Sequence, residues 1–229
     1  MIYIGMDDTD TLQTRGTGHL ARTLAAQLTE IGDVFGVSRH QLLFDPRVPY
    51  TAKNSCACVQ VDPNEPVDLN QLSQTLVAFM REHYVEGSDP GLCIAIDVPE
   101  AITAFGQRAK AELVTQAEAR SLAAEHGLFL RGLGGTEDGI IGALSAVGLA
   151  ATGQDGRFPM YGGNRQLVGL ESISAILATG IAEVRDTEEN TITEGLVETE
   201  GKARPAYRDG VAILYVARDG GHWRAIKRD

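Results

Sequence analysis

Residues 2–11 read Ile-Tyr-Ile-Gly-Met-Asp-Asp-Thr-Asp-Thr, an apolar run that ends in an acidic turn. The apolar run Ile2–Met6 is typical of a short buried strand. The turn gathers three carboxylates and two hydroxyl groups, on Asp7, Asp8, Thr9, Asp10 and Thr11. Carboxylates this close together repel one another unless a hard cation is bound, and oxygen-only ligand sets suit Mg²⁺. The segment predicts either a magnesium site or a solvated turn whose side chains cap a neighbouring element.

The composition is that of a folded globular protein. The chain has 229 residues, of which 43% are hydrophobic and 22% charged, so wholesale disorder is excluded. The formal net charge of −11 argues against a protein that coats nucleic acid through its phosphates. The first residues do not resemble a signal peptide, and no apolar stretch reaches the roughly 20 residues of a membrane helix. We therefore expect a cytoplasmic protein without a membrane partner.

The three cysteines, Cys56, Cys58 and Cys93, cannot all pair, and no CxxC motif occurs. Cys56 and Cys58 are two positions apart and would project from one face of a strand. A zinc or redox site would need more partners than these. We expect buried, reduced cysteines.

The first fifty residues predict a helix between two extended segments. The helix is expected from Gly18 to Glu30, with leucines at 20, 24 and 28 on one face. Residues 34–44 are expected to be extended. The two prolines of 45–50 then require a loop.

Residues 54–131 show a strand–helix alternation. Asp68 and Thr115 each begin a capping-box pattern, which predicts helices over 68–84 and 115–127. A short helical piece is expected over 99–105. Strands are expected at 56–61, 92–98, 109–114 and 128–130. The resulting order of strands and helices is the ferredoxin-like one. We therefore expect a separate α/β (α+β) unit at 54–131 that is inserted into the first domain.

The remainder is expected to be helical first and then β-rich. Helices are predicted over 140–151 and 171–178. Strands are predicted at 192–198, 211–217 and 222–227, with Asp219-Gly220 as a hairpin turn between the last two. Residues 181–229 would thus form a small β-rich C-terminal extension.

Two glycine-rich turns precede predicted helices. The first contains Arg15, Gly16, Thr17, Gly18 and His19. Backbone N–H groups at a helix start bind anions, and glycines let a phosphate approach them. The turn begins too far from its strand for a dinucleotide-binding fingerprint, and the chain has no G-x-x-x-x-G-K-[ST] motif. A plain helix cap is the alternative interpretation.

The second glycine-rich turn covers residues 132–142. Gly134, Gly135 and Gly139 are candidate phosphate contacts. Gly139 and Gly142 are at helical spacing and allow close approach of a backbone, which could equally belong to a neighbouring element. Both turns together with the acidic residues favour a phosphate-rich ligand.

Three motifs resemble those of archaeal agmatinylcytidine synthetases, which modify the isoleucine tRNA anticodon. Residues 5–10, Gly-Met-Asp-Asp-Thr-Asp, resemble the G-I-D-D-T-D signature that opens these enzymes. Residues 45–50, Asp-Pro-Arg-Val-Pro-Tyr, are similar to the N-P-x-I-P-Y loop. Residues 139–148 are similar to the G-[LI]-I-G-A-L-A-A-[VI]-G helix.

The resemblance implies a kinase-like domain that binds ATP and Mg²⁺, accompanied by a ferredoxin-like domain. We assign the kinase-like domain to 1–53 and 132–180, the ferredoxin-like domain to 54–131 and the extension to 181–229. The family has an autophosphorylated threonine after its acidic motif, and Thr17 is its only plausible counterpart here. The tail from residue 181 is too short for the tRNA-holding OB and zinc-ribbon modules and has no cysteine. ATP and magnesium handling is therefore carried over, and tRNA agmatinylation is not.

The predicted function is ATP- and Mg²⁺-dependent phosphoryl or pyrophosphoryl transfer to a small-molecule acceptor. The predicted catalytic residues are Asp7, Asp8, Asp10 and Thr17, and the three aspartates are also the metal ligands. Thr9, Thr11, the two glycine-rich turns, Arg15, His19 and Lys53 would contact ATP, with Arg47 as a further cation. The alternatives are a nucleotide-binding sensor without catalysis and an RNA-modification subunit that acts with a separate tRNA-binding chain. Binding of tRNA by the isolated chain is not expected, and a homodimer stays open.

Overall fold

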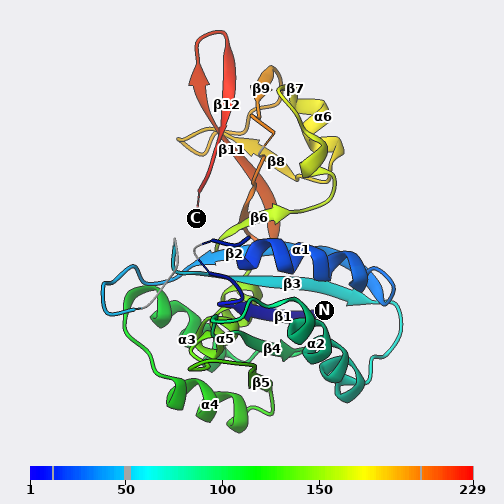
Figure 1. Cartoon of the computed structure of the whole chain (residues 1–229). Helices are drawn as coiled ribbons and strands as arrows, with labels where there is room; N and C mark the ends of the chain where they lie inside the picture. The colour runs from blue at the N-terminus through cyan, green and yellow to red at the C-terminus, as the bar shows by residue number, and fades with distance from the viewer. Residues whose placement is uncertain (12, 49–52, 202, 229) are drawn as a thin grey trace. The chain divides into compact units, whose positions relative to one another are not determined.

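The computed structural model describes residues 1–11, 13–48, 53–201 and 203–228. The chain divides into two compact units, Met1–Thr152 and Gly153–Asp229, whose ribbons are labelled in Figure 1. Each unit is described by itself. Pro49 and Tyr50 of the predicted proline loop lie outside the described residues.

The first unit is built on a sheet with the strand order β5-β4-β1-β3-β2. All neighbouring strands in this part run antiparallel. The strands are β1 (Ile2–Asp7), β2 (Gly32–Gln41), β3 (Ser55–Pro63), β4 (Gly91–Ala95) and β5 (Phe129–Gly132). β1 is the middle strand, so its end lies between β4 on one side and β3 on the other.

Five helices accompany this sheet in the described residues: α1 (Thr17–Leu28), α2 (Leu69–His83), α3 (Glu100–Ala111), α4 (Gln116–Glu125) and α5 (Gly139–Ala151). The Asp68 carboxylate accepts hydrogen bonds from the backbone N–H groups of Asn70 and Gln71 at the start of α2. The Thr115 hydroxyl accepts the Glu118 N–H at the start of α4. The two predicted caps are confirmed.

The predicted strand over 109–114 is wrong. Residues up to Ala111 belong to α3, in which Ile102, Phe105 and Ala109 are all buried. Their spacing of three and four positions follows the period of a helix, whereas a strand would alternate every second residue. The helical piece expected over 99–105 is therefore longer than predicted, and 54–131 contains three described strands.

A ferredoxin-like order does occur, but from residue 2 to residue 95. The succession β1-α1-β2-β3-α2-β4 folds into the antiparallel strand order β4-β1-β3-β2, which is the split β-α-β arrangement. Segment 54–131 contributes β3 and β4 on the two sides of β1. The predicted domain boundaries at 53, 131 and 180 stay a prediction.

Helix α5 packs on the sheet face that carries Tyr3, Gly5 and Asp7. A Cβ atom at Gly5 would collide with the Ala143 carbonyl of α5, so only glycine permits this close approach. The three cysteines lie buried on the same side, among residues of α5. Ile2, Ile4 and Met6 alternate with this set and are fully buried on the opposite face.

The second unit has the strand order β6-β10-β11-β12-β9-β7, and β8 pairs in parallel with β11. Its helix α6 (Ile173–Ala178) is shorter than the predicted 171–178, because Leu170–Ser172 forms strand β7. The predicted Asp219-Gly220 hairpin is confirmed by the Asp219–His222 pairing. The other strands are β6 (Arg157–Met160), β8 (Glu183–Arg185), β9 (Leu196–Glu198), β10 (Ala206–Arg208), β11 (Val211–Asp219) and β12 (His222–Ile226).

The core of the second unit is apolar and centres on Trp223 of β12 and Leu214 and Val216 of β11. The predicted strand at 192–198 is reduced to β9, residues 196–198. None of the helices formed by the described residues has the length and apolar character needed to cross a bilayer.

Candidate functional site

Strand register brings the predicted site residues to one end of the first sheet. Asp7 of β1 is paired with Gly91 of β4, and Gly91 is paired with Gly132 of β5. On the other side of β1, Met6 is paired with Ala57 near the start of β3. The end of β1 therefore meets the loops before β3 and β4 and the turn after β5.

Helix α5 begins at this same end. The Gly139 N–H donates to the Asp89 carbonyl at 2.9 Å, and a Cβ atom at Gly139 would lie 3.0 Å from the Asp7 carbonyl oxygen. A Cβ atom at Gly142 would overlap the Asp7 carboxylate. The sequence motifs at 5–10 and 139–148 thus contact each other. Gly139 and Gly142 give room to neighbouring elements of the chain, the alternative that the sequence left open.

Asp7 is held under the start of α5. Its carboxylate accepts the backbone N–H of Asp8, and burial raises its pKa well above the ordinary value, with the charges of Asp8 and Asp10 adding to the shift. The positive charge of Arg39 lowers the pKa of Asp7 in part. An ionised Asp7 is thus costly in the absence of a further cation.

Asp8 forms the corner of the acidic turn. Its φ angle is +50°, in the left-handed region that aspartate enters more easily than most residues. Burial, followed by the charges of Asp89, Asp10 and Asp138, raises the pKa of Asp8 to about 6. The Asp8 carboxylate also accepts the Asp89 backbone N–H, which lowers the pKa in part.

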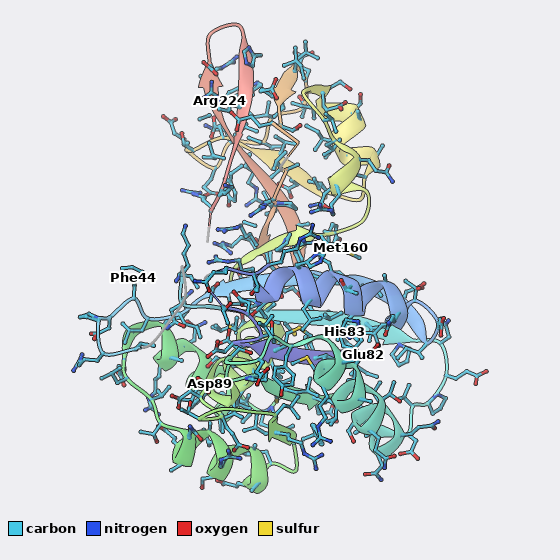
Figure 2. All side chains as sticks on the ribbon, viewed as in Figure 1. Phe44, Glu82, His83, Asp89, Met160 and Arg224 are labelled. Atoms are coloured by element: carbon cyan, nitrogen blue, oxygen red, sulfur yellow. The ribbon has the colours of Figure 1, made fainter. Side chains whose placement is uncertain are left out.

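Asp89 and Asp138 are site residues that the sequence did not identify. Both are distant from the acidic motif along the chain, and Asp89 reaches it only because β4 pairs with β1. Figure 2 shows Asp89 in the first unit. The signal for Asp89 was a Ser-Asp-Pro-Gly loop directly before a predicted strand, which by itself predicts a turn. Asp138 lies within the second glycine-rich turn, 132–142, in which only the glycines were candidates.

Asp10 caps helix α1. Its carboxylate accepts the Thr17 backbone N–H and the Thr17 hydroxyl, both at 3.0 Å. The Thr9 hydroxyl donates to the Thr17 hydroxyl at 3.2 Å. Thr11 and Thr14 bond each other at the other side of the turn. The start of α1 therefore holds a carboxylate of the chain at the position where a phosphate was predicted.

The second glycine-rich turn also surrounds a carboxylate. The Thr136 N–H donates to the Asp89 carboxylate, and a Cβ atom at Gly135, whose φ is +58°, would overlap that carboxylate. Gly134 lies against Tyr84, with 3.5 Å between its ideal Cβ position and the tyrosine oxygen. The second glycine-rich turn therefore packs against the Asp89 carboxylate and binds it.

The candidate cations occupy different places. Arg15, before α1, and His19, in the first turn of α1, are hydrogen-bonded at 3.3 Å, and both are exposed. Desolvation, together with the charges of Arg15 and Arg22, lowers the pKa of His19. Arg47 forms a bidentate pair with Asp45 at 2.8 Å for both bonds. Lys53 is exposed directly before β3, at the site's end of the sheet.

The carboxylate and hydroxyl oxygens of the acidic turn are the kind of ligands that Mg²⁺ prefers. Across the described residues, however, no three acidic, histidine or cysteine side chains converge on one point, and Asp10 is engaged by Thr17. The set fits an ion bound by one or two carboxylates and completed by phosphate oxygens and water, which is the usual arrangement for Mg²⁺.

Comparison with known proteins gives a consistent set of relatives. The tRNA(Ile2) 2-agmatinylcytidine synthetase TiaS of Pyrococcus horikoshii is 30% identical over 155 residues, which cover 65% of this chain and 35% of the relative. The curated homologues of this chain are tRNA(Ile2) 2-agmatinylcytidine synthetases. The TiaS of Cenarchaeum symbiosum is 26% identical over 151 residues, 64% of this chain and 33% of its own length. No family model matches the chain.

Solved structures agree with the sequence relatives. The TiaS–tRNA(Ile2)–ATP complex aligns with a TM-score of 0.54 and 26% identity over 64% of this chain and 36% of TiaS. Apo TiaS aligns with a TM-score of 0.52 and 25% identity over 64% of this chain and 35% of its own. The resemblance read from the three motifs is confirmed, and this chain is a mixed α/β protein similar to TiaS. It matches about a third of the length of these relatives.

Proposed function

We propose that this chain binds ATP together with Mg²⁺ at the acidic end of the first sheet and transfers a phosphoryl or pyrophosphoryl group to a small-molecule acceptor. One observation carries the proposal. Asp8 stands at a strained corner among the charges of Asp10, Asp89 and Asp138, and its pKa is raised to about 6. Strain and perturbed carboxylates collect at functional sites because stability alone does not favour them.

A cation bound at this corner would remove the repulsion among the carboxylates. Asp8, which is half-buried at the corner of the turn, is the proposed first ligand, and Asp7 the second. Bound Mg²⁺ would neutralise charge on the transferred phosphoryl group. Asp10 has a different proposed role, because it is already committed to Thr17. It orients the start of α1 toward the phosphates.

The exposed cations complete the proposed nucleotide site. Arg15 before α1, His19 on α1 and Lys53 before β3 would neutralise the remaining phosphate charge. The Thr17 hydroxyl donates to Asp10 at 3.0 Å, which is the geometry of a nucleophile beside a general base. If Thr17 accepts the γ-phosphoryl group of ATP, the new bond from its oxygen to phosphorus forms as the bond to the β,γ-bridging oxygen breaks, so that ADP leaves and Asp10 takes the proton of the hydroxyl.

The relatives support the ATP part of the proposal. TiaS has been solved with tRNA(Ile2) and ATP, and with tRNA(Ile2), AMPCPP and agmatine. We propose a small molecule as the acceptor for this chain and do not include tRNA, because the net charge of −11 opposes contact with a polyphosphate backbone. Tight tRNA binding at physiological salt in a filter assay would contradict this part.

The test is calorimetry of ATP binding with Mg²⁺ and with EDTA. Asp8→Asn keeps the side-chain volume and removes one charge, so we expect Mg²⁺-dependent ATP affinity to fall at least about tenfold. Asp68→Asn is the matched control, because asparagine caps a helix as well as aspartate and Asp68 is at the start of α2. Equal ATP binding by all three proteins, with and without metal, would contradict the proposal.

Product analysis separates the proposed chemistry from its alternative. Phosphoryl transfer leaves ADP, whereas pyrophosphoryl transfer leaves AMP, and ³¹P NMR distinguishes the two. Mg²⁺-dependent binding without either product, over a broad panel of acceptors, would instead support a nucleotide-binding sensor.

A further inference from the structure

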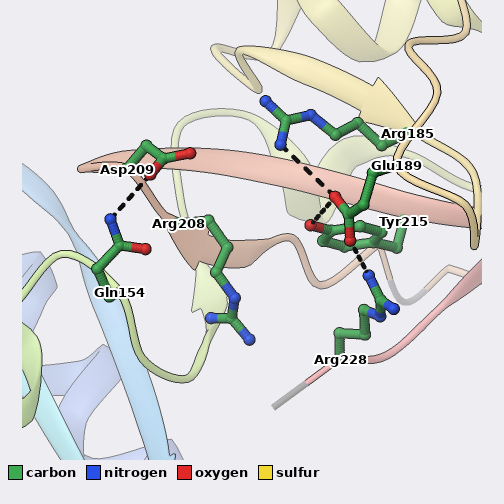
Figure 3. Close-up of a pocket in the computed structure, with 7 residues that line it drawn as sticks. All are labelled: Gln154, Arg185, Glu189, Arg208, Asp209, Tyr215 and Arg228. Atoms are coloured by element: carbon green, nitrogen blue, oxygen red, sulfur yellow. Dashed lines mark hydrogen bonds and ion pairs between the residues drawn. The ribbon is translucent and has the colours of Figure 1, made fainter.

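A polar pocket of about 310 Å³ lies within the second unit. Three arginines line it: Arg185 at the end of β8, Arg208 at the end of β10, and Arg228 after β12. Figure 3 shows their side chains around the pocket, together with Tyr215 of β11 and Glu189. None of these residues belongs to the acidic end of the first unit.

The carboxylates of the pocket are already engaged. Glu189 accepts the Tyr215 hydroxyl at 2.8 Å and the Arg228 guanidinium, and Arg185 lies 3.6 Å away from it. Asp209 accepts the side-chain amide of Gln154 at 2.8 Å. The dashed lines of Figure 3 trace these contacts. Both acids thus have their hydrogen bonds supplied by the chain itself.

Arg208 is arranged differently from the other two arginines. Its Nη1 donates to the backbone carbonyls of Gly156 at 3.2 Å and Tyr207 at 2.7 Å. In the part of the chain that the structure describes, it forms no ion pair with a carboxylate. The two backbone bonds hold the guanidinium at the pocket (Figure 3), and its remaining N–H groups are donors for a bound anion.

The lining carries three guanidinium groups and two carboxylates, a net charge of +1 within a chain of net charge −11. A guanidinium fork matches the oxygens of a phosphate in geometry and charge. The volume is at the lower end of the range for small-molecule sites, roughly 300 to 1,000 Å³. We propose that this pocket binds a small phosphomonoester through its phosphate group, with Arg208 as the main contact and Arg228 and Arg185 beside it.

The experiment measures binding of inorganic phosphate to the full chain by calorimetry. Every protein carries Asp8→Asn, so that failure of the proposed nucleotide site cannot alter the result. We expect saturable binding in the millimolar range or tighter, weakened at least about tenfold by Arg208→Gln. Arg224→Gln is the matched control, because Arg224 pairs with Asp219 on the β11–β12 hairpin, outside the lining (Figure 2). Its affinity should change less than about twofold.

A variant with the opposite effect protects the test against simple misfolding. Glu189→Gln removes one negative charge from the lining and keeps a hydrogen-bonding group, so phosphate affinity should rise several-fold. A binding loss caused by misfolding would not produce this gain, and thermal unfolding of each variant checks the fold.

Ribose 5-phosphate and dimethyl phosphate distinguish the source of the phosphate. The proposal predicts tighter binding of ribose 5-phosphate, because a monoester dianion carries more charge than a diester. It is overturned if phosphate does not bind at about 10 mM, if Arg208→Gln and Arg224→Gln weaken binding equally, or if the diester binds as tightly as the monoester.

Discussion

Helices α1 and α5 both begin after a glycine-rich turn, and in each turn a carboxylate of the chain accepts backbone N–H groups. At α1 the carboxylate is Asp10, which bonds Thr17. In the turn before α5 it is Asp89, which bonds Thr136. The glycines differ in their surroundings. A Cβ at Gly18 would have its nearest neighbour, Arg22, at 3.8 Å, whereas one at Gly139 would overlap the backbone of the β4 segment.

This difference assigns different roles to similar sequences. The glycines at the start of α5 allow the helix to press on β1 and β4, so they are structural. The start of α1 is open, and exposed cations flank it. We propose that a bound nucleotide reaches the start of α1, where the Asp10 side chain would share its hydrogen bonds with a phosphate.

The largest predicted effect is on stability at Gly139. Gly139→Ala places a Cβ atom 2.7 Å from the Gly91 nitrogen and 3.0 Å from the Asp7 carbonyl oxygen, and rigid backbone cannot move aside without cost. We expect the free energy of unfolding to fall by about 3 kcal/mol, as for other overpacked sites. Urea denaturation measures it.

Gly18→Ala is the control for this comparison. The added methyl group has room, and alanine favours a helix more than glycine does. Its stability should stay equal or rise by less than about 1 kcal/mol. Equal losses in both variants would mean that the two turns do not differ as described.

The second prediction concerns pH. The pKa of Asp8 is about 6 in the folded chain against 3.8 ordinarily, so between these values the folded state binds more protons than the unfolded state. Stability must then fall as pH rises from about 4 to about 6. The loss should be about 1.5 kcal/mol, because Asp8 is only half-buried and water screens its charge.

Denaturation midpoints across this pH range check the sign. Asp8→Asn removes one titrating group and should make the decline smaller, leaving the part that is due to the raised pKa of Asp7. Saturating Mg²⁺ should also reduce the decline if the ion binds the carboxylates. A parent protein that becomes more stable from pH 4 to pH 6, with the same slope in Asp8→Asn, would contradict the electrostatic account.

The smallest predicted effect concerns the cap of α1. Asp10→Ala and Asp10→Asn remove the same charge, but only asparagine keeps an acceptor for the Thr17 N–H. We expect the alanine variant to be less stable than the asparagine variant by about 1 kcal/mol. Equal stability of the two would show that the Asp10–Thr17 bonds do not hold the start of the helix.

Local signals in the sequence predicted the parts of the fold that depend on neighbouring residues. Asp68 and Thr115 cap their helices as expected, and Asp219-Gly220 forms the hairpin. The error at 109–114 arose from a short apolar run, in which helical and strand periods are hard to distinguish. Strand pairing was the main feature that local patterns could not supply. For this reason the sequence could not show that β1 and β2 share the ferredoxin-like order with β3 and β4.

The candidate site, like the fold, could be predicted where a local motif marks it. The acidic turn and the start of α5 each carry a motif, and the structure brings them into contact. Asp89 and Asp138 were missed because they join the site only through the pairing of β4 with β1 and the position of α5. The sequence also could not show that Asp10 and Asp89 fill the two glycine-rich turns, since each bond joins segments that only the fold places together.

We propose that Asp8 binds the metal ion that accompanies ATP. A crystal structure of the chain with ATP and Mn²⁺ in place of Mg²⁺ tests it most directly, because anomalous scattering locates the manganese. The account predicts a peak about 2 Å from an Asp8 carboxylate oxygen, as in octahedral sites of such ions, with a phosphate oxygen of ATP on the same ion. Nucleotide bound elsewhere, with no manganese at Asp8, would contradict it.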